Sequence, residues 1–339
     1  MTAKLVRTAL RSATAFLALG CTAVLAQQPV AMKIGLGTIN EPQHHFVEAF
    51  KAEVEKKTDG KVQVQVFPAG QLGAAPRQIE GLQLGTIEGF QSPSAFLKGV
   101  DPVFEITEAP GIVLGYDHAA ATYADAKFRD AFLNHAKAKG VIGIAIWPHS
   151  PTSLLTVAPM RTLADMRGRK IRVLATKIEQ AIMAEFGATG VPIPFEELMP
   201  ALQSRTVDGL RSSMVVTAAM KYYTVTKFVV PINDTMTATG LWVSTAFWDK
   251  LPADLRKTLA DTGQGLEKTG VEMGRKALET AEKTWADNGG EVTKWSAAEV
   301  AEFMRRVQPH AEEVFGKSPD AGTREVWAVF KDAAARTRR

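Results

Sequence analysis

A strand–helix–strand order near the N-terminus restricts the fold more than any other feature of the sequence. Residues 32–36 are typical of a strand, and apolar residues recur at helical spacing over 46–54. Valines then alternate with glutamines over 62–66, which predicts a strand with one buried face. The two strands of such a unit should be parallel, with a right-handed crossover.

A second unit with the same order lies further along the chain. Residues 170–174 predict a strand, a helix should end near Gly187, and residues 191–193 predict the returning strand. Two α/β modules are the simplest arrangement that accounts for both units.

The two modules also share a short sequence echo. LQLGTIEGFQS at 82–92 matches LQSRTVDGLRS at 202–212 at five of eleven positions. Each copy predicts the end of a helix, an acidic turn with a glycine, and a strand that runs to a serine. Ser92 and Ser212 should then lie near carboxyl ends of strands, where open α/β sheets bind ligands. Coincidence in a common helix–turn–strand pattern is the alternative.

The first 26 residues have the pattern of a secretory signal. Three basic residues precede an apolar segment, and small residues before Gln27 offer a cleavage site. A membrane anchor is an alternative, although the apolar segment is shorter than the ~20 residues that span a bilayer. In a lipoprotein, Cys21 would be the acylated first residue. It is the chain's only cysteine, so the mature protein should have no disulfide.

The charge balance gives no sign of a nucleic-acid partner. The signal carries three of the 40 basic residues and none of the 36 acidic ones, so the mature chain is nearly neutral. It contains no dense run of lysine and arginine.

Residues 251–288 predict one long helix, or two helices broken near Gly263–Gly270. Such a helix would be long enough to brace both modules. The glycines lower its intrinsic stability, so packing must hold it.

Sequence motifs of common enzymes and cofactor sites are absent. The segment at 35–40 follows a strand, but Asn40 stands where a dinucleotide fingerprint has its third glycine. No metal site is indicated, because neighbours such as His44 and His45 point in different directions on a helix. Glu196, Glu197 and Asp208 could form a catalytic carboxylate pair, but acids at a helix start stabilise the helix dipole without catalysis.

Arg172 is the strongest candidate for a binding residue. In the strand at 170–174, Ile171 and Val173 share one face and Arg172 lies on the other, near the carboxyl end. A guanidinium there can bind a carboxylate through two parallel hydrogen bonds. A solvated arginine on an edge strand is the alternative.

Several ordered motifs resemble the DctP-type solute-binding proteins of tripartite ATP-independent periplasmic (TRAP) transporters. The resemblance extends from Met32 to about Gly290. Its most specific segments are FPAGQLG at 67–73, LADMRGRKIRV at 163–173, GA at 187–188 and VPIPF at 191–195, extended by ALQ at 201–203 and VDG at 207–209.

The resemblance implies an α/β fold of two periplasmic-binding-protein-like domains, joined by hinge strands and braced by the long C-terminal helix. We expect domain I to comprise residues 27–150 and about 240–275. Domain II should comprise residues 151–239 and about 276–339. An organic acid would be captured between them.

The resemblance also assigns ligand-binding residues. The carboxylate-binding arginine of the family falls on Arg172, and its pocket aromatic residue falls on Phe195. A second arginine is replaced by Ser153 and the pocket asparagine by Ser212. The full expected set is Arg172, Phe195, Ser212, Ser153, Arg211, Ser92, Gln91 and His149.

These departures change the expected ligand. Pro93 stands where members that bind sialic acid carry a pocket glutamate. We therefore expect a smaller or more apolar monocarboxylate, unless Arg211 turns inward and binds a second acid.

The expected function is capture of a small organic acid in the periplasm and its delivery to a TRAP membrane permease. We expect no catalysis, cofactor, metal, nucleic-acid partner or stable membrane insertion of the mature chain. A secreted hydrolase with a spatial carboxylate pair and a binding protein of an ATP-driven importer remain as alternatives.

Overall fold

The computed structural model describes residues 28–338. The expected signal at 1–26, including Cys21, lies outside the described residues. Within them, no helix combines the length and the apolar character needed to cross a bilayer.

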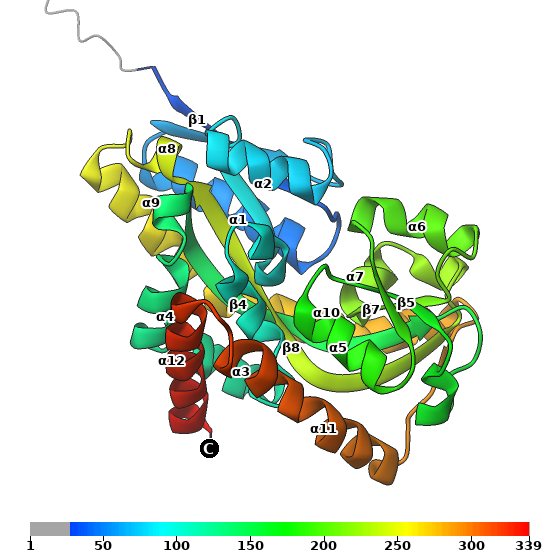
Figure 1. Cartoon of the computed structure of the whole chain (residues 1–339). Coiled ribbons are helices and arrows are strands. Elements are labelled where there is room, and N and C mark those ends of the chain that lie inside the picture. The colour runs from blue at the N-terminus through cyan, green and yellow to red at the C-terminus, as the bar shows by residue number, and fades with distance from the viewer. Residues whose placement is uncertain (1–27, 339) are drawn as a thin grey trace, which may run out of the picture.

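One nine-stranded sheet runs through the molecule and bends between two lobes (Figure 1). Its strand order is β2-β1-β3-β8-β4-β7-β5-β6, with β9 paired to β8. The strands are β1 (Val30–Leu36), β2 (Val62–Phe67), β3 (Gly89–Pro93), β4 (Val141–Thr156), β5 (Lys170–Val173), β6 (Thr189–Pro192), β7 (Gly209–Ser213), β8 (Phe228–Ser244) and β9 (Glu291–Val292).

The long antiparallel strands β4 and β8 belong to both lobes. The first half of β4 pairs with the end of β8, which pairs with β3 of the first lobe. The second half of β4 pairs with the start of β8 and with β7 of the second lobe. These two strands are therefore the continuous connection at the centre of the molecule.

Both predicted strand–helix–strand units are confirmed. In the first lobe, β1 and β2 are parallel and flank α1, whose apolar side packs into the core. In the second lobe, β5 and β6 are parallel and flank α5. Burial alternates along β2 as the valine–glutamine pattern requires.

The sequence echo corresponds to a repeated structural contact. Each copy ends a helix and enters a strand, β3 in the first lobe and β7 in the second. The acid of the turn accepts a backbone hydrogen bond in both: Glu88 from Lys33 N at 2.9 Å and Asp208 from Lys170 N at 2.8 Å. Asp208 is thus a structural acid in the described chain.

Helices cover both faces of the sheet. The α-helices are α1 (Pro42–Lys57), α2 (Ala75–Leu84), α3 (Gly115–Tyr123), α4 (Ala126–Leu133), α5 (Lys177–Glu185), α6 (Phe195–Gln203), α7 (Met214–Ala219), α8 (Thr245–Trp248), α9 (Ala253–Gly265), α10 (Glu267–Asp287), α11 (Ala297–Ala311) and α12 (Ala321–Thr337). Shorter turns of helix are η1 (Ser94–Gly99), η2 (Pro102–Glu108), η3 (Lys137–Lys139), η4 (Leu163–Met166), η5 (Tyr222–Thr224) and η6 (Glu312–Gly316).

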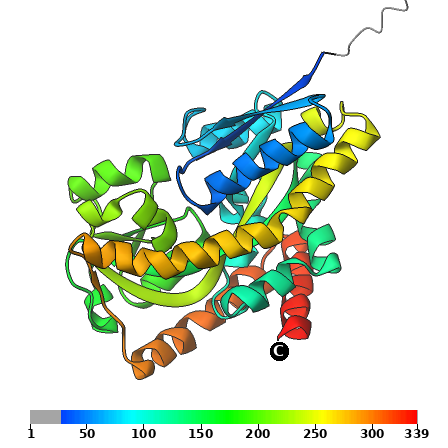
Figure 2. The ribbon, with the colours of Figure 1, turned by 180° about the vertical axis from the view of Figure 1, so that it is seen from behind.

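The predicted long helix forms as α9 and α10, which meet at Leu266. Helix α10 contacts α1 of the first lobe and α7 of the second, and Figure 2, which views the molecule from behind, shows it crossing both lobes on the near side. Gly270 faces β4, where an added Cβ would lie 2.7 Å from the Trp147 ring. The glycine therefore permits close packing of the brace against the hinge strand.

The C-terminal helices divide between the lobes. Helix α11 packs on α5 of the second lobe, whereas α12 packs on α3, α4 and η2 beside the first. Assigning all of 276–339 to domain II does not describe the position of α12. Its buried Trp327 and Phe330 join the aromatic core that contains Phe128.

Candidate functional site

A cavity lies between the lobes, at the ends of β1, β3, β5 and β7. The volume that the centre of a water molecule can occupy in it is about 60 Å³. The first lobe contributes Gly37, Thr38, Gln43, Gln91, Ser92, Pro93 and Phe96; the hinge region contributes Glu108, His149, Thr152 and Thr237; the second lobe contributes Arg172, Leu174, Glu179, Phe195, Arg211, Ser212, Ser213 and Val216. The cavity therefore uses both lobes and both hinge strands.

Arg172 lies on β5 with its guanidinium in the cavity wall, and only 2% of the residue is exposed. Its Nε donates to the Ile193 carbonyl at 2.8 Å, and Cζ lies 5.8 Å from the Phe195 ring centroid. Among the described residues, no carboxylate lies within ion-pair distance of it. The solvated edge-strand alternative is therefore wrong for this side chain.

The burial of Arg172 has an electrostatic cost. Burial lowers its pKa, and the more distant Glu179, Tyr222 and Glu196 offset this only in part. A buried cation without a close partner is unfavourable by several kcal/mol. An anion in the cavity would remove that penalty.

Phe195 begins α6 and forms part of the apolar wall. Its ring packs against Tyr222, with centroids 5.4 Å apart. Phe96, Leu174 and Val216 add apolar surface to the same cavity. The site therefore combines a guanidinium that has no ion-pair partner among the described residues with apolar walls, as in many small-ligand sites.

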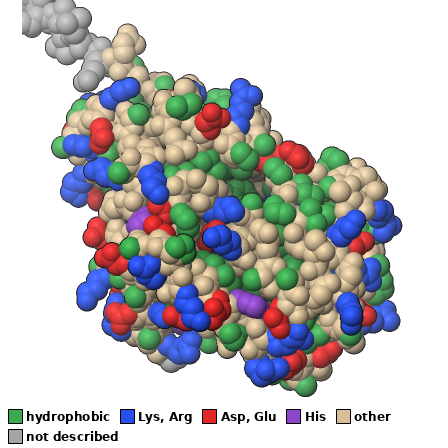
Figure 3. Space-filling model, in the orientation of Figure 1, with side chains coloured by type: hydrophobic (Ala, Val, Ile, Leu, Met, Phe, Trp, Pro, Cys, Tyr) green, Lys and Arg blue, Asp and Glu red, His purple; other side chains and the backbone are tan. Residues whose placement is uncertain are grey.

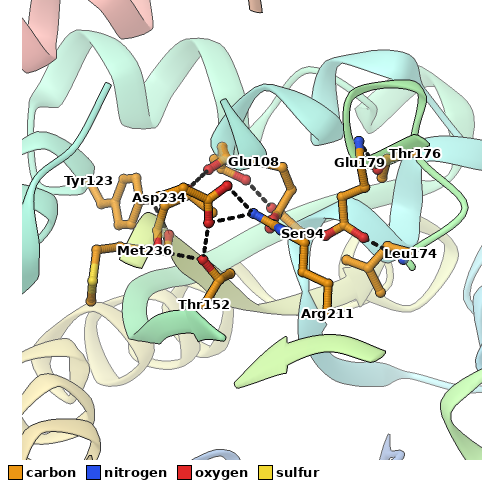
Figure 4. Close-up of polar contacts among 12 residues, drawn as sticks. Ser94, Glu108, Tyr123, Thr152, Leu174, Thr176, Glu179, Arg211, Asp234 and Met236 are labelled. Carbon is orange, nitrogen blue, oxygen red and sulfur yellow. Dashed lines mark hydrogen bonds and ion pairs between the residues drawn. The ribbon is translucent and has the colours of Figure 1, made fainter. Parts of the chain in front are cut away.

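Arg211 also points inward, but three carboxylates surround it (Figure 4). Its Nη2 donates to both carboxylate oxygens of Asp234, at 3.1 and 3.0 Å. Its Nη1 donates to Glu179, and also lies 3.4 Å from Glu108 Oε2. Burial opposes its charge, yet these acids raise the pKa of Arg211 above its usual range. The sequence left open whether an inward Arg211 binds a second acid of the ligand. Its three carboxylate partners leave it unavailable for that role.

The other members of this cluster are fixed by further hydrogen bonds. Asp234 also accepts from the Thr152 hydroxyl, and Glu179 accepts from Leu174 N at 2.6 Å. Glu108 differs, because its Oε1 has no hydrogen-bond partner among the described residues. Burial, aided by the charges of Glu179 and Asp234, raises the pKa of Glu108 to about 7.

His149 belongs to a hydrogen-bond chain that joins the lobes. Its Nε2 lies 2.8 Å from Glu41 Oε2, and Nδ1 lies 3.0 Å from Ser150 Oγ, which donates to Ser213 at 2.5 Å. Burial opposes ionisation of Glu41, but His149 and Thr38 together lower its pKa. The chain connects α1, β4 and α7.

Seven of the eight residues expected from the sequence line this cavity. Ser153 does not. It lies on β4 in a different pocket, with Met236, Leu278 and others. The register of β4 shifts between Pro148 and Ser150 and again between Pro151 and Ser153. The first shift leaves His149 without a partner in β8 and reverses the alternation, so His149 lines the cavity whereas Pro151 and Ser153 face the other pocket.

Sequence reasoning missed the acids of the cavity, Glu108 and Glu179, and their neighbour Asp234. A signal for two of them exists, since Glu108 and Asp234 each stand in a largely apolar segment. Buried charged residues need partners, so an acid in such a segment predicts a buried ion pair. Their common partner could not be identified without the fold.

A larger apolar pocket of about 390 Å³ adjoins the cavity. The two share Phe96, Arg172 and Leu174. The outer pocket is lined further by residues of α2 and by Pro192, Ile193 and Pro194. Figure 3 shows hydrophobic side chains gathered where the lobes meet. This pocket extends the apolar surface beyond the Arg172 guanidinium.

The lobes touch at the rim through Glu196, in the first turn of α6. A Cβ added at Gly37 of the first lobe would lie 2.9 Å from Glu196 Oε1. Burial raises the pKa of Glu196, and the charge of Arg172 opposes that rise. The close approach of the lobes therefore depends on glycine at position 37.

We expect Gly37→Leu to hinder closure and to weaken carboxylate binding about tenfold or more, because overpacking costs roughly 1–3 kcal/mol. Small-angle scattering should show a larger radius of gyration, and calorimetry the weaker binding. Gly265→Leu is the matched control, since nothing lies within 4 Å of a Cβ there. Equal behaviour of the two variants would contradict a role of Gly37 in closure.

The sequence of this chain is similar to those of known solute-binding proteins. The family model described as bacterial extracellular solute-binding protein, family 7 (DctP) matches residues 37–318. The 2,3-diketo-L-gulonate-binding periplasmic protein YiaO of Escherichia coli is 29% identical over 72% of this chain and 74% of its own length. The C4-dicarboxylate-binding periplasmic protein DctP of Rhodobacter capsulatus is 27% identical over 94% and 97%.

A solved structure shares the fold over nearly its full length. It is a TRAP periplasmic solute binding protein from Desulfovibrio salexigens with bound orotic acid. The TM-score is 0.86 at 28% identity, covering 91% of this chain and 99% of the other. The chain belongs to the DctP family, the bacterial extracellular solute-binding proteins of family 7.

Proposed function

We propose that this protein captures a small monocarboxylate between its lobes in the periplasm and delivers it to a TRAP-type membrane permease. The observation that carries the proposal is Arg172, a buried guanidinium that faces the cavity without an ion-pair partner among the described residues. A carboxylate can bind such a group through two parallel hydrogen bonds.

Arg172 favours an anion because its dehydration has already taken place in the folded protein. The ligand's own dehydration must still be offset, and one ion pair does not supply the roughly 8 kcal/mol of a micromolar complex. The apolar walls around Phe195, Phe96 and Leu174 would supply the remainder.

Relatives of this chain support an acidic ligand. The names of the compared proteins refer to C4-dicarboxylates, to 2,3-diketo-L-gulonate and to orotic acid. The carboxylates around Arg211 favour a monocarboxylate for this chain, because a second ligand carboxylate near Glu108 and Glu179 would meet like charge.

Closure of the lobes would enclose the acid. The domains of this proposal, 27–150 with about 240–275 and 151–239 with most of 276–339, would rotate about β4 and β8. Periplasmic binding proteins are a known example of such hinge closure. The ligand lowers the energy of the closed state because it contacts both lobes.

Capture without turnover is tested by offering small monocarboxylates to the purified protein. We expect one acid per chain by native mass spectrometry and an unfolding temperature that rises with acid concentration. The acid should be recovered unchanged after prolonged incubation. Conversion of the acid would support the hydrolase alternative, and absence of any stabilising carboxylate would refute the proposal. Genomic neighbours that encode ATP-driven rather than TRAP subunits would refute the delivery step.

A further inference from the structure

Gln91 places an unused acceptor at the cavity. Its Nε2 donates to Thr239 Oγ1 at 3.0 Å, and the Thr239 hydroxyl donates to Gln43 Oε1 at 2.7 Å. In this arrangement the Thr239 hydroxyl uses its one proton on Gln43 and accepts from Gln91, so the Gln91 amide presents its oxygen elsewhere. Gln91 Oε1 then has no partner among residues 28–338, although only 1% of Gln91 is exposed.

Glu108 places a second unused oxygen at the same cavity. Its Oε2 lies 3.4 Å from Nη1 of Arg211, whose guanidinium also pairs more closely with Glu179 and Asp234. Its Oε1 has no partner within the described chain. Only 1% of Glu108 is exposed. Two buried oxygens in one cavity wall thus lack a hydrogen-bond donor, which native proteins rarely leave unsatisfied.

Resting on the proposed function, we propose that Gln91 and Glu108 form a subsite that recognises a hydrogen-bond donor on the captured carboxylate, either a hydroxyl or an ammonium group. Arg172 binds the acid, and the subsite selects among acids by the donor that they carry. Simple unsubstituted monocarboxylates are therefore poor ligands.

The charge balance around the subsite favours a donor over an acceptor. Glu108, Glu179 and Asp234 surround the single cation Arg211, so the cluster carries a surplus of negative charge when ionised. Ligand oxygens without a proton would be repelled, whereas an O–H or N–H group relieves the surplus. A site built to bind such a group rejects the analogue without it by up to ~10⁴-fold.

A ligand donor bound to Glu108 would make affinity depend on pH in one direction. The groups facing Glu108 are Arg211 from β7, Glu179 from α5, Asp234 from β8 and Tyr123 from α3. Together with burial, they leave Glu108 with a pKa of about 7 in the unliganded protein. A donor binds the ionised form, so affinity should rise as pH increases from about 6 to 8. A ligand acceptor would bind the protonated form and give the opposite slope.

The test compares butyrate with the hydroxybutyrates and the aminobutyrates by calorimetry on the full mature protein. We expect at least one substituted acid to bind ten times or more tightly than butyrate. Gln91→Met should remove most of that preference, whereas the matched control Gln65→Met, at an exposed position on β2, should keep it.

Glu108→Gln distinguishes the two kinds of donor. It retains an acceptor and relieves the charge surplus, so the variant should fold. A hydroxy acid should lose less than about tenfold in affinity with this variant, whereas an amino acid should lose more and should no longer respond to pH.

The outcomes separate the inference from the proposed function. If butyrate binds as tightly as every substituted acid, or affinity falls as pH rises, the donor subsite is refuted while capture through Arg172 stands. If no acid of the set binds and none stabilises the protein, both are refuted.

Discussion

Replacing Arg172 by methionine should reduce carboxylate affinity at least about 100-fold without destabilising the unliganded protein. Removing one member of a buried ion pair between partners costs roughly 2–5 kcal/mol of binding. In the unliganded state, however, Arg172 has no ion-pair partner among the described residues, and burial lowers its pKa. Isothermal calorimetry and urea unfolding measure the two effects.

The combination of these effects is diagnostic. Substitution of an arginine with a structural role would lower the stability of the protein. Substitution of an arginine that only binds ligand would lower the affinity for the ligand and leave stability unchanged. Arg167→Met is the control, because Arg167 is exposed in the same motif. Arg172→Lys should recover only part of the affinity, since an ammonium cannot form the two parallel bonds of a guanidinium. A loss below about tenfold for Arg172→Met would place the anchor elsewhere.

Arg211→Met should have the opposite result and destabilise the protein by roughly 3–5 kcal/mol, because it strands three buried carboxylates. Those carboxylates belong to Glu108, Glu179 and Asp234. Urea unfolding at pH 7 measures the loss. Arg305→Met, which breaks an exposed ion pair on α11, should unfold as the parent protein does.

The pH dependence gives a second check on Arg211. Burial already raises the pKa of Glu108, and the Arg211 charge opposes that rise, so removing the guanidinium should raise the pKa of Glu108 further above its unfolded value. The folded variant then binds more protons than the unfolded chain, so its stability should increase as pH falls from about 7 towards 5. A loss that does not depend on pH in this range would indicate a packing defect instead of stranded charge.

The local elements were predictable because they depend on short-range patterns. Alternating valines gave β2, and helical spacing gave α1, α9 and α10. The position of Arg172 was predictable for the same reason, since β5 begins at Lys170 and alternation places the guanidinium. The structure places its side chain in the cavity wall.

Most of the polar site was not predictable in this way. Glu108 and Arg211 are 103 residues apart in sequence, and Glu41 and His149 are 108 apart. No periodicity links such positions, because their meeting depends on how the two lobes pack around β4 and β8. The acids were therefore missed, and the inward Arg211 was left without its partners.

The sequence alone determined two α/β modules, a bracing helix, a family motif and one arginine near the end of a strand. Only the tertiary structure decided which charges are satisfied: Arg211 by three acids, and Arg172 by none of the described residues. It also placed Ser153 outside the cavity, through a bulge in β4 at His149 that no alternation pattern reveals. The reason is that local patterns are set by neighbouring residues, whereas charge compensation and the facing of side chains after a bulge are set by contacts between distant segments.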